Sequence, residues 1–138
     1  MELPLSAEEL IPHRLPMRLI DRLLEIEGKN GVVEAQVAAK CPFVDANGTL
    51  EDVAMIELIA QAYAALKGYL DRLEDKPVRQ GFLVGIKKIT MLKSARAGDR
   101  LRIEIRTLGE VADFAIAEGR IWRGTELIAR GEIKVWIN

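Results

Sequence analysis

Residues 53 to 66 read V-A-M-I-E-L-I-A-Q-A-Y-A-A-L, and this stretch decides how the rest of the chain is arranged. Its side chains are apolar on nearly every face of a helix, which is typical of a helix surrounded by the rest of its domain. Glu57 and Gln61 are the two exceptions, and because they are four residues apart they lie on the same side of the predicted helix. A buried carboxylate is usually hydrogen-bonded or has its pKa raised, and both conditions suit a residue that transfers protons. The alternative is a partly buried structural acid bonded to a neighbouring strand or to an Arg or Lys side chain.

The flanking sequence indicates where this helix begins and ends. Thr49 is followed three residues later by Asp52, which is the spacing of a capping box, and acidic side chains in the first turn favour the positive end of the helix dipole. The polar run over residues 71–76, followed by Pro77, closes the helical region, and Gly68 is a possible weak point. The sequence therefore predicts one long helix that begins near Asp52.

The other segments carry strand patterns. Residues 18–27 and 32–39 predict a hairpin around a Gly-rich turn. No further helical period follows the helix, and four segments rich in β-branched and apolar residues take its place: 78–93, 100–108, 111–122 and 126–137. This order of elements predicts an α+β fold in which an antiparallel sheet wraps around one long central helix.

The composition restricts the partners and the setting. The net charge is -1, the pI is near 5.9, and acidic and basic residues are interleaved, so nothing points to nucleic acid or to an anionic membrane. Cys41 is the single cysteine, and the supply of Cys and His is too small for a zinc site. The amino terminus lacks the pattern of a signal peptide, and the apolar helix is short for a membrane span. We expect a cytoplasmic protein with one domain over residues 1–138 and with no metal or cofactor.

Three stretches, in order along the chain, resemble a known family. Residues 11–22, I-P-H-R-L-P-M-R-L-I-D-R, resemble the motif L-P-H-R-x-P-x-x-x-x-D-R, and residues 56–61, I-E-L-I-A-Q, resemble L-E-x-x-A-Q. Residues 82–86, F-L-V-G-I, and then 97–99, A-G-D, resemble an F-x-G-I strand and a P-G-D turn. The family is that of the 3-hydroxyacyl-acyl-carrier-protein dehydratases. The resemblance implies a hot-dog fold and dehydration of acyl thioesters in fatty-acid or polyene-type biosynthesis.

The chain departs from this family at a catalytic position. The family carries a histidine in an H-F-P loop between a P-F dipeptide and the central helix. Here Pro42-Phe43 is followed by V-D-A-N-G-T over residues 44–49, a shorter loop without histidine. The chain's one histidine, His13, belongs to the opening motif instead. The shorter loop resembles that of divergent dehydratase-like hot-dog proteins associated with aryl-polyene-type biosynthesis.

Dehydration of a 3-hydroxyacyl thioester needs a base for the α-proton, an acid for the leaving hydroxyl and donors for the enolate-like oxygen. Glu57 is the candidate acid or base, and Gln61 could orient it or hold a water. Backbone N–H groups of Val53 and Ala54, at the helix start, are candidates to polarise the thioester carbonyl.

The group that replaces the absent histidine has three candidates: Asp45 in the shortened loop, His13, or a residue of a partner subunit. Asp45 beside Glu57 would form a pair of carboxylates. Their mutual repulsion would raise the pKa of one, which would act as the acid, and leave the other ionised to act as the base. Each has a structural alternative, since His13 is fixed between two prolines and an Asp before a Gly-containing turn often binds backbone amides.

Other functions and assemblies are open at this point. Some hot-dog thioesterases work with a helix carboxylate and water, so Glu57 with Gln61 would suffice for hydrolysis. A non-catalytic subunit that binds acyl chains or carrier protein is the third function. The resemblance implies a thioester of acyl-carrier protein or coenzyme A as substrate. Because exposed sheet edges are usually paired, we expect a homodimer joined edge to edge, or a heterodimer with a related dehydratase subunit.

Overall fold

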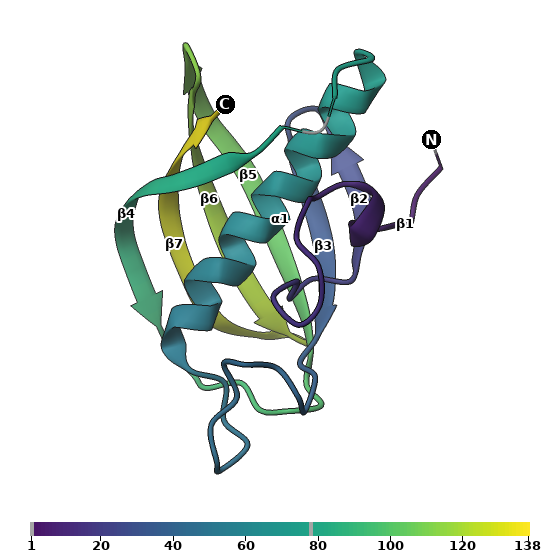
Figure 1. Cartoon of the computed structure of the whole chain (residues 1–138). Coiled ribbons are helices and arrows are strands. Elements are labelled where there is room, and N and C mark those ends of the chain that lie inside the picture. Colours follow the sequence, from purple (N-terminus) through teal and green to yellow (C-terminus); the bar gives the residue numbers. More distant parts are fainter. Residues whose placement is uncertain (1, 78) are drawn as a thin grey trace.

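An antiparallel sheet curves around one long helix, α1 (Asp52–Leu73), in the computed structural model, which describes residues 2–77 and 79–138 (Figure 1). The seven strands are ordered β1-β2-β3-β5-β6-β7-β4 across the sheet. Their bounds are β1 Leu5–Ser6, β2 Arg22–Glu27, β3 Asn30–Gln36, β4 Gly81–Met91, β5 Arg100–Val111, β6 Phe114–Arg123 and β7 Glu126–Ile137. The predicted α+β arrangement, a sheet wrapped around a central helix, is confirmed.

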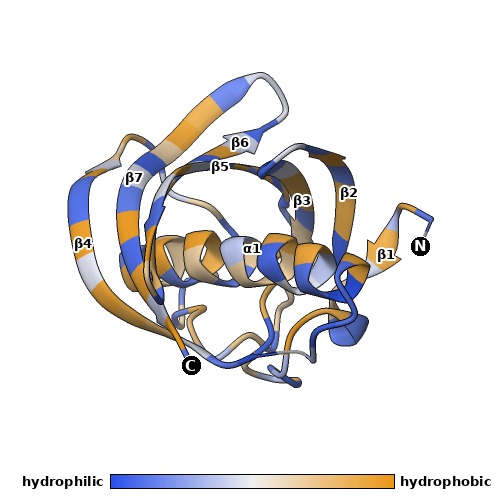
Figure 2. Ribbon diagram, turned by 90° about the horizontal axis from the view of Figure 1, so that it is seen from above, coloured by the Kyte–Doolittle hydropathy of each residue, from blue (hydrophilic) through white to orange (hydrophobic). Residues whose placement is uncertain are grey.

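Figure 2 shows α1 lying within the curve of the sheet, and the buried core residues come from the helix and from the strands around it. Strand β5 shows the alternation that produces this core: Leu101, Ile103 and Ile105 are buried, while the residues between them are exposed. Burying a side chain of this size stabilises the fold by roughly 1.5–3 kcal/mol. Gly119 of β6 lets the helix approach closely, because a Cβ there would lie 2.6 Å from Ile59 Cγ2.

The start of α1 differs from the prediction. Its N-cap is Glu51, which makes no side-chain capping bond, so the predicted capping box at Thr49 is wrong. Thr49 forms a β-bridge with Arg96 instead, and its Oγ1 accepts a hydrogen bond of 3.1 Å from the Arg96 guanidinium. A residue held in an extended bridge cannot also turn its side chain onto the first helical amides.

The helix also continues past the predicted weak point. Gly68 lies inside α1 and is buried against the backbone of Leu10, where an added Cβ would collide with the Leu10 carbonyl. At 22 residues α1 is long and apolar enough to cross a membrane by length and composition alone, so the prediction that it is too short is wrong. In the structure 61% of its most apolar window is buried inside the protein.

The N-terminal part is less regular than predicted. Residues 10–21 cross α1 without regular structure, after a single 3-10 turn at Ala7–Glu9, and β2 begins only at Arg22. The later strands follow the predicted segments with shifted ends; β5 runs through Val111, and the turn to β6 falls at residues 112–113.

Candidate functional site

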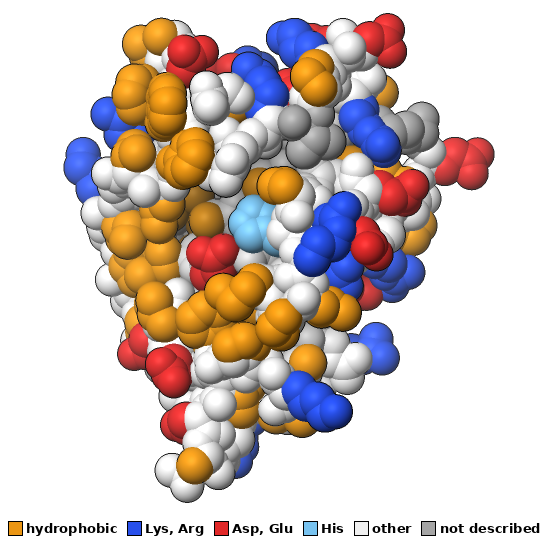
Figure 3. Space-filling view, in the orientation of Figure 1, with side chains coloured by type: hydrophobic (Ala, Val, Ile, Leu, Met, Phe, Trp, Pro, Cys, Tyr) orange, Lys and Arg blue, Asp and Glu red, His pale blue; other side chains and the backbone are white. Residues whose placement is uncertain are grey.

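A cavity of about 200 Å³ runs along one side of α1. It is bounded by the irregular segment before β2, by the first residues of β4 and by the last residues of β7. Figure 3 shows the histidine side chain in a hollow beside an acidic side chain, with apolar side chains around them. The polar residues that line the cavity are His13, Glu57, Gln61, Tyr63, Lys67, Asp71 and Arg79.

Glu57 lies in the second turn of α1 and lines this cavity. Its Oε1 accepts a hydrogen bond of 2.9 Å from Gln61 Nε2 and lies 3.9 Å from His13 Nε2. The predicted neighbourhood of carboxylate and amide is therefore confirmed. The side chain of Glu57 is 33% exposed, so it is less buried than the apolar helix suggested and can be reached from the cavity.

Gln61 is buried, at 1% exposure, and makes more contacts than the sequence indicated. Its Oε1 accepts a hydrogen bond of 2.7 Å from the Leu19 amide, and its Nε2 donates to the Met17 carbonyl at 2.8 Å as well as to Glu57. Because the Leu19 amide only donates and the Met17 carbonyl only accepts, these two groups fix the orientation of the side-chain amide. Glu57 Oε1 thus receives a hydrogen bond, whereas Oε2 has no hydrogen-bond partner among the described residues and is the oxygen available to exchange a proton.

His13 reaches Glu57 because Gln61 holds the irregular segment against α1. The imidazole is about as exposed as its partner, at 32%, and its Nδ1 is buried without a hydrogen-bond partner among the described residues. The 3.9 Å between Nε2 and Glu57 Oε1 suits an ion pair but is too long for a direct hydrogen bond. Of the candidates for the absent histidine's place, His13 is the one that this chain brings to Glu57.

Asp45 has a different environment. Its Oδ1 accepts hydrogen bonds from the amides of Asn47 at 2.9 Å and Thr49 at 3.0 Å, both within its own loop. It does not line the cavity that contains Glu57. Within one chain the predicted pair of carboxylates is therefore not formed, because the loop amides hold Asp45 in the alternative role of a loop cap.

The helix start does not reach the cavity either. The Ala54 amide donates to the Glu51 carbonyl at 3.0 Å, so it is already used in the first turn. Val53 is 51% exposed, and neither residue lines the cavity around Glu57. The candidate role of these two amides in polarising a carbonyl has no support from the geometry of this chain.

The far end of the cavity carries a charged cluster that the sequence reasoning missed. Asp71 is 2% exposed and is bound by the Arg79 guanidinium through both oxygens, at 3.1 and 3.2 Å, while Lys67 Nζ lies 3.3 Å from its Oδ1. Burial raises the pKa of the nearby Tyr63 phenol, and the charges of Glu110 and Asp71 raise it further. The sequence did contain a signal for this cluster. Lys67 and Asp71 have i,i+4 spacing and lie on the same side of the helix as Glu57.

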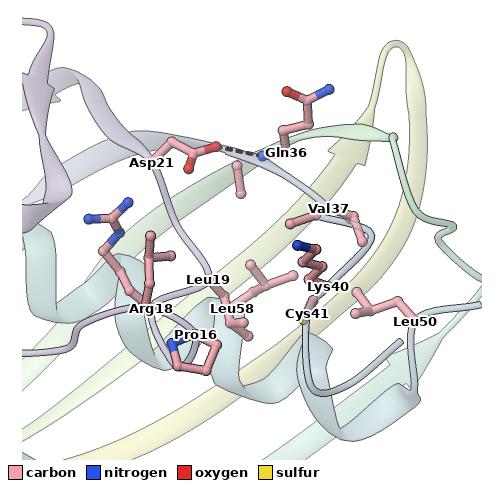
Figure 4. A pocket seen from close by; sticks show the side chains of 13 residues that line it. Pro16, Arg18, Leu19, Asp21, Gln36, Val37, Lys40, Cys41, Leu50 and Leu58 are labelled. Atoms are coloured by element: carbon pink, nitrogen blue, oxygen red, sulfur yellow. Dashed lines mark hydrogen bonds between the residues drawn. The ribbon is translucent and has the colours of Figure 1, made fainter. Parts of the chain in front are cut away.

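A second cavity, of about 330 Å³, lies on the other side of the irregular segment (Figure 4). Its walls are mostly apolar and include Leu19, Val37 and Leu58, with Arg18 and Lys40 as the cationic residues. Asp21 in its wall accepts a hydrogen bond of 2.7 Å from the Gln36 amide. This cavity is larger than the one around Glu57. The cavity around Glu57 is nevertheless the better candidate for an active site, because it holds the paired carboxylate and imidazole.

Comparison with known proteins gives consistent likenesses. Residues 5–138 match the family model described as ApeP-like, ApeP dehydratase. The chain is 33% identical over 128 residues to the 3-hydroxyacyl-[acyl-carrier-protein] dehydratase FabZ of Alkaliphilus metalliredigens, covering 89% of this chain and 85% of that protein.

Solved structures show the same fold. The dehydratase heterocomplex ApeI:P from Xenorhabdus doucetiae superimposes with a TM-score of 0.90 at 21% identity, covering 97% of this chain and 91% of that chain. A hypothetical thioesterase from Streptococcus pneumoniae, solved with coenzyme A, has a TM-score of 0.67 at 13% identity, covering 84% and 86%. These likenesses confirm the hot-dog fold that the motifs implied.

Proposed function

The chain belongs to the ApeP-like dehydratase family, and we propose that it removes water from 3-hydroxyacyl groups on acyl-carrier protein to give the 2-enoyl thioester. The observation that carries this proposal is the placement of Glu57, oriented by Gln61 and facing His13, in a cavity beside the central helix. We take residues 1–138 to act as a single hot-dog domain in the cytoplasm, in fatty-acid or polyene-type biosynthesis.

The proposed chemistry uses the two facing side chains. Glu57 accepts the α-proton on Oε2, the electron pair forms the carbon–carbon double bond, and the C–O bond to the hydroxyl breaks. His13, in its protonated form, donates a proton to the departing hydroxyl, which leaves as water. The reaction leaves the carboxyl protonated and the imidazole neutral. A proton passed between these neighbouring groups, through water at their 3.9 Å separation, restores the starting state.

Exposed apolar side chains on β4, beside the cavity, support the presence of a second subunit. Strand β4 lies at one edge of the sheet, and its Leu83 and Ile86 are in register with Val135 and Ile133 of β7, which are buried. Leu83 and Ile86 are nevertheless 40% and 48% exposed. We propose that β4 pairs with the same edge of another hot-dog subunit and that this subunit covers the cavity.

The identity of that subunit has two forms. It is a second copy of this chain in a homodimer, or a related dehydratase subunit in a heterodimer, and the heterocomplex of similar fold supports the second form. The donors that polarise the thioester carbonyl would then come from the partner.

A second candidate function is thioester hydrolysis. The similarity to a hypothetical thioesterase with coenzyme A supports it, since Glu57 with Gln61 could activate water for attack on the thioester of coenzyme A or acyl-carrier protein. The dehydratase function is favoured because the family match spans nearly the whole chain.

An assay of the purified protein on a 3-hydroxyacyl-carrier protein, alone and with a related dehydratase subunit, tests the proposal. We expect the enoyl product, and we expect Glu57→Gln to lower turnover by at least about 100-fold, since it removes the acid–base group. The matched control is Glu104→Gln on the exposed face of β5, which should keep full activity. Both variants should melt like the wild type. Release of free acid would assign hydrolysis instead, and no product in either mixture would leave acyl or carrier-protein binding as the function.

A further inference from the structure

The cavity around Glu57 continues along α1 to the charged cluster at its far end. Glu57, Ala60, Ala64, Lys67 and Asp71 all line it, and their spacing of three or four residues places them on one side of the helix. Lys67 is ten residues beyond Glu57, which corresponds to about 15 Å along the helix axis. The cavity therefore has a reactive end and a distant polar end.

The part between these ends suits a hydrocarbon chain. Ala60 and Ala64 contribute only methyl groups, and the facing walls come from Leu83 of β4 and from Val135 and Ile137 of β7. Side chains this small on the helix leave width for an extended chain, and the apolar walls replace water around it.

The far end has more positive than negative charge among its lining residues. Among the described residues that line this end, Asp71 is the one carboxylate, and it faces two cations, Arg79 and Lys67. Arg79 already occupies both oxygens of Asp71, whereas the Lys67 ammonium has three donors. Asp113 acts electrostatically on Arg79 and Glu74 interacts electrostatically with Lys67, but neither carboxylate lines the cavity.

We infer that this site selects acyl chains whose far end carries an anionic hydrogen-bond acceptor, such as a carboxylate, which Lys67 binds. The inference rests on the proposed function and specifies its substrate class. A chain that ends in a methyl group would place hydrocarbon against the ammonium and the guanidinium, displacing water from them without replacing its hydrogen bonds. The alternative is that Lys67 and Asp71 only form an i,i+4 ion pair that stabilises α1.

Binding by calorimetry separates these two roles. The probes are pantetheine thioesters of a linear dicarboxylic acid and of the monocarboxylic acid of equal chain length, titrated into the full chain in the assembly that it forms. We expect the carboxylate-ended probe to bind about tenfold more tightly, as one charge-assisted hydrogen bond provides. In a series of lengths, the preference should be largest when the carboxylate is about 15 Å from the thioester.

Three variants complete the test. Lys67→Met should abolish the preference, Lys67→Arg should retain it, and Lys93→Met, at an exposed lysine outside the cavity, should leave it unchanged. Equal or weaker binding of the carboxylate-ended probe to the wild type, or a preference that persists in Lys67→Met, would overturn the inference. Because binding requires no turnover, a retained preference without enoyl product counts against the proposed reaction alone, and enoyl product without a preference counts against this inference alone.

Discussion

At the scale of single residues, the site depends on which side chain works with Glu57. His13 lies 3.9 Å from Glu57, whereas Asp45 binds the amides of its own loop. We expect His13→Ala to lower dehydration by roughly 100-fold or more, the usual contribution of a general acid. Asp45→Asn, which keeps an acceptor oxygen, should change turnover only a few-fold. If Asp45→Asn instead caused the large loss of turnover and His13→Ala the small one, Asp45 would act in the cavity of a partner subunit and His13 would have a structural role.

A second residue gives a pH-dependent prediction. Burial raises the pKa of the Asp99 carboxyl, but hydrogen bonds from the Arg96 amide and the Arg123 guanidinium outweigh this and hold the pKa below its usual range. The carboxylate thus stabilises the fold above the unfolded pKa of about 4, and this contribution is lost as the pH falls through the lower folded value. Thermal melting should show Asp99→Asn less stable than the wild type at pH 7, with a gap that closes in acid. A gap independent of pH would disprove this account.

At the scale of elements, the contact between α1 and the N-terminal segment depends on Gly68. An alanine there would gain up to about 1 kcal/mol of helix propensity, but its Cβ would collide with the Leu10 carbonyl. Backbone cannot move as cheaply as a side-chain end, so we expect Gly68→Ala to reduce the free energy of unfolding by about 1–3 kcal/mol in urea titrations.

The matched control for this contact is Gly109→Ala. No atom lies within 4 Å of a Cβ at that position, so its effect should be small. A Gly68→Ala protein as stable as the wild type would mean that the segment before β2 can shift away from α1, and Gln61 would then not hold it in place.

At the scale of the whole molecule, the exposed apolar side chains of β4 predict an assembly. We expect light scattering to show a dimer at micromolar concentration, either of this chain alone or after mixing with a related dehydratase subunit. Ile86→Glu, which puts a charge on the open edge, should shift the protein to monomer and lower dehydration with it. Arg130→Glu on the outer face of β7 is the charge-changing control and should leave the dimer intact. A monomer under both conditions, or a dimer that persists in Ile86→Glu, contradicts pairing through β4.

The features that depend on local periodicity are predictable from the order of residues alone. The apolar run over residues 53–66 and the alternating segments after it predict one central helix and an antiparallel sheet, because side-chain burial follows the helical and strand repeats. The contact between Glu57 and Gln61 is of the same kind, since i,i+4 neighbours meet within any helix. The ends of elements were less predictable. Thr49 contacts Arg96 instead of capping the helix, and Gly68 packs against Leu10 within the helix instead of ending it.

The residues that surround Glu57 from outside α1 depend on long-range contacts. His13 meets it because an irregular segment crosses α1, and that path is set by the bonds of Gln61 to Met17 and Leu19, which no sequence period encodes. Arg79 likewise reaches Asp71 from beyond the end of the helix. Contacts between segments distant in sequence depend on how the chain folds back on itself. This is why Glu57 and Gln61 could be predicted as neighbours within α1, whereas their contacts with residues outside the helix could not.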